Sequence, residues 1–181
     1  KKKKKKKKKK KIPTTMFAFL SLHAVLHGIV VPAVHSRASV SCGPKAASVH
    51  PFASSGSNLD SQAAAASALD RVAFPPDGLW STAQFCDELR CERTMALGAW
   101  LPCDEGQETL VGMAFTSTVL DETSLTTLAV HPSTRQQGLA EILLRECMAS
   151  ACAAGSQRFL LEVRASNTNA IALYSKCGLS C

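Results

Sequence analysis

Leu128-Ala129-Val130-His131-Pro132 leads through two residues into Arg135-Gln136-Gln137-Gly138-Leu139-Ala140, and the pattern of this segment is the most informative in the chain. Its first part is a β-type apolar run that Pro132 interrupts, and a helical pattern begins at Leu139. Gly138 and the small Ala140 let a ligand approach the backbone, while the free N–H groups of a first helical turn attract an anion. The stretch predicts a strand, a tight turn and a helix whose N-terminus holds an anion such as a pyrophosphate. A tight turn without a ligand is the alternative, and neither a P-loop nor a dinucleotide-fold glycine motif is present.

Periodic apolar patterns on both sides of this stretch outline one α/β domain. A cap at Asp60 or Ser61 begins a first helical pattern, and Ser81 caps a second. β-type runs separated by turn residues predict the strands. The expected elements are helices at 59–72 and 82–91, strands at 95–101, 110–119 and 124–130, a helix from 139 that Gly155 ends, a strand at 158–163 and a helix at 167–176. This order predicts a mixed central sheet flanked by helices.

Two apolar faces locate part of the expected core. The stripe of the long helix consists of Leu139, Ile142, Leu143, Cys147 and Ala151. The strand that follows it turns Phe159, Leu161 and Val163 to one side and Glu162 to the other. The eight cysteines form no Cys-x-x-Cys pair and have no histidine at metal-ligand spacing. Zinc is therefore not predicted, and a reduced interior is favoured over a disulfide framework.

The positive charge of the chain belongs to its first eleven residues, which are all lysine. The 181 residues carry a formal net charge of +7 with this run included. From Asp60 onward, eight lysines and arginines face all 14 acidic residues, which gives −6. A nucleic-acid-binding domain is expected to show the opposite balance, so direct nucleic-acid binding is not predicted.

The N-terminal third has the composition of a targeting leader. After the lysine run and upstream segment at 1–15, an apolar stretch resembling a secretory signal begins at Met16, and a Ser- and Ala-rich, acid-free stretch continues it to residue 58. A signal-like stretch followed by a transit-like stretch predicts import into a plastid. One alternative is a simple secretory leader that opens at Met16, with 1–15 as translated upstream sequence. The others are a mitochondrial leader, a membrane anchor, which the histidines in the apolar stretch disfavour, and a cytoplasmic protein whose leader is an artefact of the gene model.

Motifs around the long helix resemble a known enzyme family. Leu128 to Pro132 followed by Arg135-x-x-Gly138-x-Ala140 is similar to the acetyl-CoA-binding motif of the GNAT superfamily of N-acetyltransferases. Three further segments resemble the ribosomal-protein-alanine N-acetyltransferases of RimI type within this superfamily. They are Leu161-Glu162-Val163-Arg164-Ala165-Ser166-Asn167, Ala170-Ile171-Ala172-Leu173-Tyr174 with Gly178, and Trp80-Ser81 through Phe85 to Leu89. The resemblance covers 59–181 and implies the GNAT acyl-CoA N-acyltransferase fold for this domain.

The resemblance implies acetyl-CoA as cosubstrate and no metal. In the family, acetyl-CoA lies where two neighbouring strands splay apart, with its thioester along one strand and its pyrophosphate on the loop that opens the long helix. The cofactor-binding residues implied are Leu128, Ala129, Val130, Arg135, Gln136, Gln137, Gly138, Leu139, Ala140 and Asn167.

The resemblance also implies a general base at Glu162 and a general acid at Tyr174. An amine must be neutral to attack a thioester, so a base is required, and the departing CoA thiolate needs a proton. A backbone N–H of the strand at 128–130 would stabilise the oxyanion. As alternatives, Glu162 is an exposed strand residue paired with Arg164 or Lys176, Tyr174 only caps the core, and Asn167 is only a helix cap.

The family pattern continues past Gly178 with two more strands, whereas this sequence stops at Cys181. The fold is therefore expected to lack its last strands and to leave a sheet edge unpaired. The function predicted is acetyl transfer from acetyl-CoA to a protein or peptide α-amine, with a ribosomal protein as the specific substrate. The alternatives are acetylation of lysine or a small amine, and a catalytically inactive acetyl-CoA-binding module.

Overall fold

The helices and strands expected between residues 59 and 176 are all present, each within two residues of its predicted bounds. The computed structural model describes residues 15–21, 38–40, 47–76, 78–103 and 107–180. The strands are β1 (Thr15–Ser21), β2 (Ala38–Val40), β3 (Ala47–Pro51), β4 (Thr94–Pro102), β5 (Glu108–Val119), β6 (Glu122–Val130) and β7 (Arg158–Arg164). The helices are α1 (Leu59–Ala73), α2 (Thr82–Arg90), α3 (Leu139–Ala153) and α4 (Thr168–Lys176), with a 3-10 turn at Pro132–Thr134.

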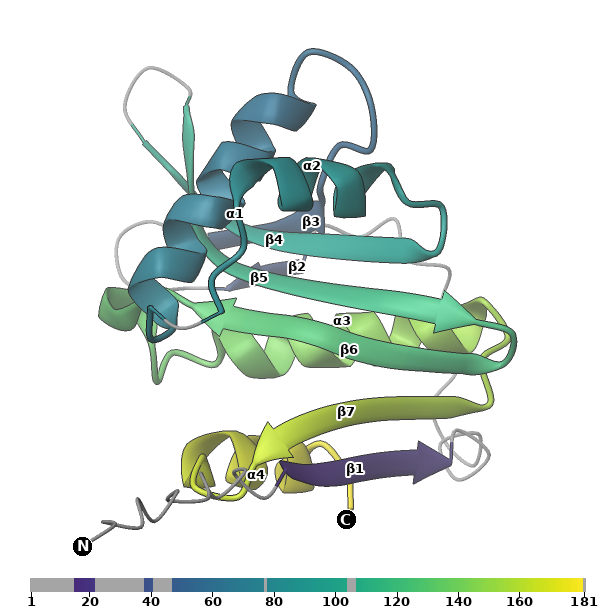
Figure 1. Cartoon of the computed structure of the whole chain (residues 1–181). Coiled ribbons are helices and arrows are strands. Elements are labelled where there is room, and N and C mark those ends of the chain that lie inside the picture. The colour runs from purple at the N-terminus through teal and green to yellow at the C-terminus, as the bar shows by residue number, and fades with distance from the viewer. Residues whose placement is uncertain (1–14, 22–37, 41–46, 77, 104–106, 181) are drawn as a thin grey trace, which may run out of the picture.

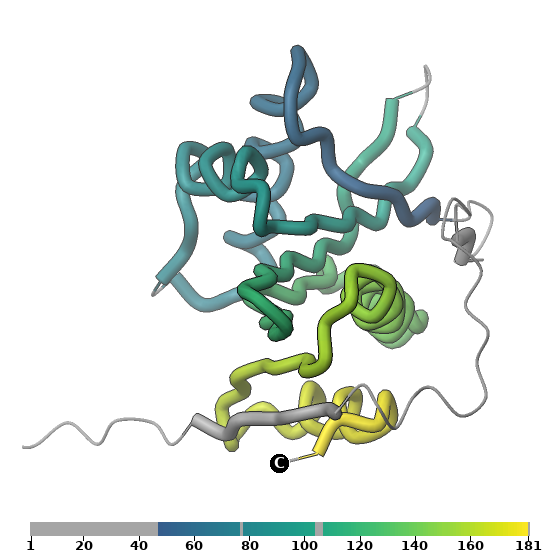
Figure 2. The backbone as a smooth tube through the Cα atoms, turned by 90° about the vertical axis from the view of Figure 1, so that its right-hand side faces the viewer, coloured from purple at the N-terminus to yellow at the C-terminus, as the bar shows by residue number. Residues whose placement is uncertain are grey.

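The strands form one mixed sheet in the order β1-β7-β6-β5-β4-β3-β2. Neighbouring strands are antiparallel except β6 and β7, which run parallel because α3 forms the crossover connection between them. Helices α1 and α2 cover one face of the sheet and α3 covers the other (Figure 1, Figure 2). The predicted α/β architecture with a mixed central sheet is thus confirmed.

Three strands come from the segment that the sequence analysis separated from the fold. In β3, Ala47 and Val49 alternate with less buried residues, and Val49 pairs with Ala99 of β4, so this strand belongs to the core. Strand β1 pairs antiparallel with β7 over seven residues, from Thr15 opposite Arg164 to Ser21 opposite Arg158. A sheet edge was expected to stay unpaired, but β1 pairs with the outer N–H and C=O groups of β7. The lysine run and about half of the predicted leader, residues 22–37 and 41–46, lie outside the described residues.

Each face of the sheet carries its own apolar core. The α3 side buries the predicted faces of α3 and β7, including Leu143, Cys147 and Phe159, each fully inaccessible. Burial raises the pKa of the Cys147 thiol to about 12, so the group is a protonated apolar side chain at neutral pH. The opposite core packs Phe85 of α2 against Phe115 of β5, with ring centroids 5.5 Å apart. The six cysteines among the described residues are free.

Local capping explains where two of the helices begin. Ser81 and Gln84 form a capping box at α2, and the side chain of Asn167 accepts from the Ala170 N–H at α4.

None of the helices in the described part of the chain combines the length and apolar character needed to cross a bilayer.

Gly98 tests the packing of the sheet away from any cleft. A Cβ at Gly98 would overlap the indole Nε1 of Trp100, whose ring stacks on His50 at 5.4 Å. We expect Gly98→Ala to lower the free energy of unfolding by about 1–3 kcal/mol, because the buried indole must move. Denaturant unfolding of the two proteins measures the change, and equal stability would contradict this packing.

Candidate functional site

The parallel pair β6–β7 separates halfway along its length. Its register runs from Glu122 opposite Arg158 to Leu125 opposite Leu161 and stops there, although β6 continues to Val130. At this point β6 also changes register against β5, which leaves Thr126 as an extra residue between the pairs of Leu125 and Thr127. Such a bulge bends a strand and increases its twist. The last residues of β6 and β7 therefore diverge toward the carboxyl ends of both strands (Figure 1).

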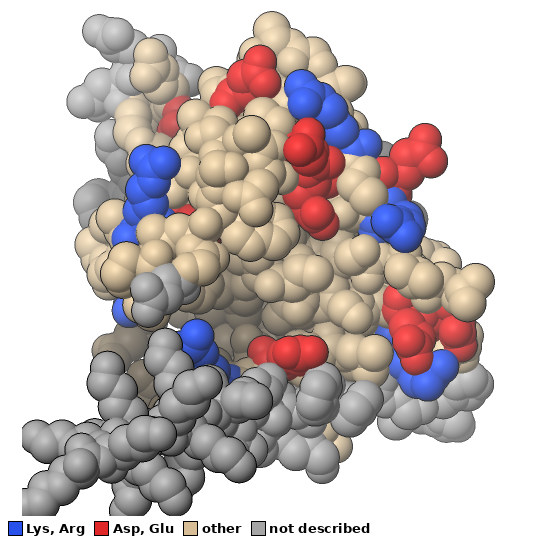
Figure 3. Space-filling view, viewed as in Figure 1, with Lys and Arg blue, Asp and Glu red and all other residues tan. Residues whose placement is uncertain are grey.

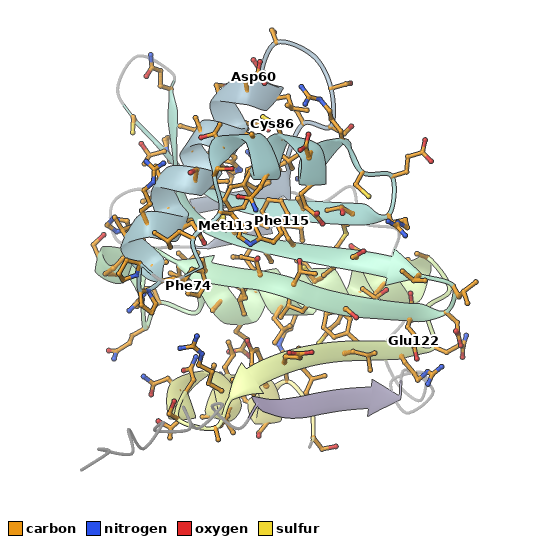
Figure 4. The ribbon with its side chains drawn as sticks, viewed as in Figure 1. Asp60, Phe74, Cys86, Met113, Phe115 and Glu122 are labelled. Carbon is orange, nitrogen blue, oxygen red and sulfur yellow. The ribbon has the colours of Figure 1, made fainter. Side chains whose placement is uncertain are left out.

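The opposite end of the pair is held closed by several hydrogen bonds. The Thr123 and Ser156 hydroxyls, both buried, lie 2.7 Å apart, and the Asp121 carbonyl accepts from the Gln157 N–H at 2.7 Å. Arg158 forms an ion pair with Glu122 at 2.7 Å. Figure 4 shows Glu122 at this closed end and Phe74 toward the open one. The strands thus open from a fixed point.

The turn after β6 is anchored to the bulge of the neighbouring strand. The Val111 carbonyl of β5 lies at a register shift and accepts from the His131 N–H at 2.8 Å and, more loosely, from the Thr134 hydroxyl at 3.5 Å. Arg135 donates from Nε to the Val130 carbonyl and from Nη2 to the Ala73 carbonyl, both at 3.2 Å. These bonds fix the turn between the end of β6 and the end of α1.

The loop that opens α3 has an unusual backbone. Gln136 and Gly138 both have positive φ, at 62° and 81°, so the chain turns twice through the left-handed region before the helix. Gly138 is the N-cap residue, and no side chain caps α3. The N–H groups of the first turn have no intrahelical partner, and the residues of this turn, Gly138 to Glu141, line the space between β6 and β7. This arrangement can bind an anion through backbone N–H groups and the helix dipole.

A cleft of about 1040 Å³ occupies the space between the diverging strands. Figure 3 shows this face hollowed between the α1–α2 layer and β7, with tan walls and both signs of charge at the lower rim. The structure brings eleven of the twelve predicted site residues to its lining. Gln137 is the exception: it is exposed and does not line the cleft.

Glu162 and Tyr174 come to the cleft from β7 and α4. Glu162 is exposed on the polar side of β7 and forms no ion pair with any described residue. The alternative pairing with Lys176 is absent, because Lys176 bonds to Glu141 instead. Tyr174 is buried, its hydroxyl bonds to no described protein group, and burial raises the pKa of its phenol. Tyr174 therefore stays protonated at pH values where an exposed tyrosine begins to ionise.

The remaining predicted residues offer mostly backbone to the cleft. Ala129, Val130 and Leu139 are buried with their side chains in the cores, so a ligand meets their main-chain groups. The Asn167 Oδ1 caps α4, as the structural alternative for this residue required. Its side chain also lines the cleft, so both descriptions apply to Asn167.

The wall formed by α1 and the following loop was missed in the sequence. Asp70 and Ser67 hold the backbone of Trp80: the Asp70 carboxylate accepts from its N–H at 2.9 Å, and the Ser67 hydroxyl donates to its carbonyl at 3.1 Å. Trp80 and Phe74 line the cleft opposite β7. A signal was present, because Asp70 shares the buried helical face of Ala63 and Ala66, where an acid needs a reason to be.

A sequence model of the acetyltransferase (GNAT) family matches residues 64–179. The chain belongs to the GNAT acetyltransferase family. The match confirms the family and fold expected from the motifs at 128–140 and 161–178, and it covers the whole cleft. Among the described residues, no group of three or more His, Cys, Asp or Glu side chains is placed to hold a metal ion.

Ribosomal-protein acetyltransferases are among its relatives within the GNAT family. The Escherichia coli K12 enzyme, [ribosomal protein bS18]-alanine N-acetyltransferase, is 41% identical over 71 residues, which are 39% of this chain and 48% of that protein. The Haemophilus ducreyi enzyme of the same name is 39% identical over 74 residues, 41% of this chain and 51% of that protein. The chain thus matches about half the length of these curated relatives.

Solved structures of GNAT proteins share the fold. The Escherichia coli ribosomal-protein-S18-alanine N-acetyltransferase superposes with a TM-score of 0.59 at 29% identity, covering 73% of this chain and 76% of that one. The PaiA N-acetyltransferase of Thermoplasma acidophilum, solved with coenzyme A, gives a TM-score of 0.59 at 15% identity, covering 71% and 86%. The latter similarity concerns the fold alone.

Arg135 tests the anchoring of the turn. We expect Arg135→Lys to lower the free energy of unfolding by about 1 kcal/mol, because one ammonium does not span the two carbonyls that the guanidinium joins. Chemical denaturation measures the change, with Arg71→Lys on the exposed side of α1 as the matched control. Equal effects of the two substitutions would contradict the role of Arg135 as a strut.

Proposed function

We propose that the chain transfers an acetyl group from acetyl-CoA to an amine, in the cleft between β6 and β7. The observation that carries the proposal is the divergence of the two strands after Leu125 and Leu161, with the uncapped N-terminus of α3 at its open end. A pyrophosphate suits these backbone donors, and an extended pantetheine arm suits the unpaired edge of β6.

The proposed chemistry is direct attack of the amine on the thioester. Glu162 accepts the proton of the attacking amine through a water, so that the nitrogen lone pair forms the new C–N bond. A backbone N–H of 128–130 stabilises the oxyanion, and Tyr174 donates its proton to the leaving thiolate. The raised pKa of Tyr174 supports this role, because the phenol keeps its proton until transfer.

For the acceptor we propose a protein α-amine, with a ribosomal protein as the specific form. The relatives named for ribosomal protein bS18 support this choice, and the charge of −6 from Asp60 onward suits a basic peptide. Lysine or a small amine is the alternative acceptor. The predicted import into a plastid stays a prediction, and the structure uses part of the same N-terminal segment as strands β1, β2 and β3.

Gly138 provides the first test, by isothermal titration of the full chain with CoA. A Cβ at Gly138 meets no protein atom within 4 Å, so Gly138→Ala tests the backbone conformation alone, at a cost of about 1 kcal/mol. Gly138→Glu adds a carboxylate at the anion site, and we expect it to bind CoA at least about tenfold more weakly than Gly138→Ala. Equal affinities of the two variants would contradict a pyrophosphate site at this loop.

Turnover of acetyl-CoA with a peptide bearing a free α-amine tests the catalytic residues. We expect Glu162→Gln and Tyr174→Phe each to lower kcat by about 10²–10³-fold, because each removes one proton transfer. Because burial raises the pKa of Tyr174, we also expect no loss of wild-type kcat through Tyr174 ionisation until the pH is above about 10, the pKa of an exposed tyrosine.

Glu92→Gln, an exposed acid outside the cleft, is the matched control and should keep the wild-type kcat. Wild-type turnover in both site variants would show that the mechanism is wrong even in an active enzyme. Tight CoA binding without turnover of any amine would favour the inactive binding module.

A further inference from the structure

A glutamate stands at the entrance of the proposed pyrophosphate site. Glu141 is the third residue of α3 and lines the cleft, with 22% of its side chain exposed. A glutamate at this position commonly turns back to cap the N-terminus of its own helix. Here such a turn would occupy the N–H groups that a phosphate needs, and it would place a negative charge beside the phosphate.

The carboxylate of Glu141 is held in another direction by two cations. Lys176 Nζ donates to Oε2 at 2.6 Å, and Arg145 donates from Nε and Nη2 to Oε1, both at 3.1 Å. Both oxygens are therefore engaged, and no side chain caps α3. Lys176 and Arg145 keep the pKa of Glu141 below its ordinary value, so the group is ionised and its charge is compensated.

The two cations differ in where they come from. Arg145 lies one turn along the same helix, as any i, i+4 pair does. Lys176 lies in the last turn of α4, two residues after Tyr174. It lines the cleft, and its ammonium contacts Glu141 of α3. Only Lys176 pulls the carboxylate toward another element.

We infer that Lys176 is a positioning residue for donor binding: it holds the Glu141 carboxylate away from the α3 N-terminus and so keeps that anion site free. The inference rests on the function proposed above and deepens it. Lys176 acts through Glu141, so removal of the Lys176 ammonium weakens donor binding only while Glu141 carries a charge.

A double-mutant cycle in the full chain tests this relation, with CoA affinity measured by isothermal titration. We expect Lys176→Met to weaken CoA binding about tenfold, the scale of one charge acting on a helix terminus. We expect Lys176→Met combined with Glu141→Gln to bind within about twofold of Glu141→Gln alone, because no charge remains to be held aside. Lys176→Arg should restore the affinity, and Arg90→Met, in an exposed ion pair of α2, should not change it.

Two results of this affinity cycle would overturn the inference. A Lys176→Met variant that binds CoA as the wild type does would show that the ion pair has no effect on the site. A double variant as weak as Lys176→Met would show that Lys176 contacts the ligand directly or only supports the fold. Turnover of S-acetylpantetheine, which lacks the diphosphate, should be equal in wild type and Lys176→Met, and a parallel loss would also exclude an effect confined to the anion site.

Hydrogen exchange of the ligand-free chain separates this inference from the proposed function. If the wild type binds no CoA, the proposed function fails. The exchange rates of the amides of residues 138–141 still report the position of the Glu141 carboxylate. In Lys176→Met the released carboxylate caps these amides and slows their exchange. Unchanged exchange would mean that Lys176 does not hold Glu141 aside.

Discussion

The one extra residue at Thr126 is the constraint on which the site depends. A parallel pair with continuous register would keep β6 and β7 about 4.8 Å apart and leave no room for a ligand. The bulge turns β6 away after Leu125, and the Thr126 hydroxyl secures it by donating to the Phe115 carbonyl at 3.1 Å. The divergence is therefore built into the neighbouring β5–β6 pair, which is continuous on either side of the shift. Opening the cleft requires no loss of pairing there.

The divergence of β6 and β7 leaves polar backbone groups without partners at the cleft, and extra hydrogen bonds form at the closed end of the pair. Unpaired backbone groups are tolerable where water or a ligand reaches them. The cleft gathers such groups from the end of β6 and from the first turn of α3. The closed end compensates with the buried Thr123–Ser156 contact and the Asp121 carbonyl, which accepts from two successive N–H groups. The unsatisfied groups thus coincide with the place where substrate is proposed to bind.

The sequence was sufficient for the elements that local patterns encode. Gly138 predicted a helix start with an accessible backbone, the apolar stripe of α3 predicted its buried face, and Asn167 was a candidate cap of α4. It was insufficient where the cause is non-local. The bulge at Thr126 depends on how β6 pairs with β5, and the ion pair of Glu141 with Lys176 joins residues 35 apart. Strand β3 was missed because its five residues lie within a stretch with the composition of a leader.

The two walls of the cleft are held by different forces, and this difference bears on how the site works. Hydrogen bonds between backbone groups and the side chains of Asp70, Ser67 and Arg135 fix the wall near Trp80, and they depend little on salt. The wall that carries Tyr174 shares the apolar core of α3, and its polar contact with that helix is the Lys176–Glu141 pair, whose strength falls as salt screens it. The polar contacts of the wall near Trp80 are therefore the less salt-sensitive ones. The donor side keeps an adjustable contact at the point where the pyrophosphate is proposed to enter, so binding of that anion and the position of α4 are physically connected.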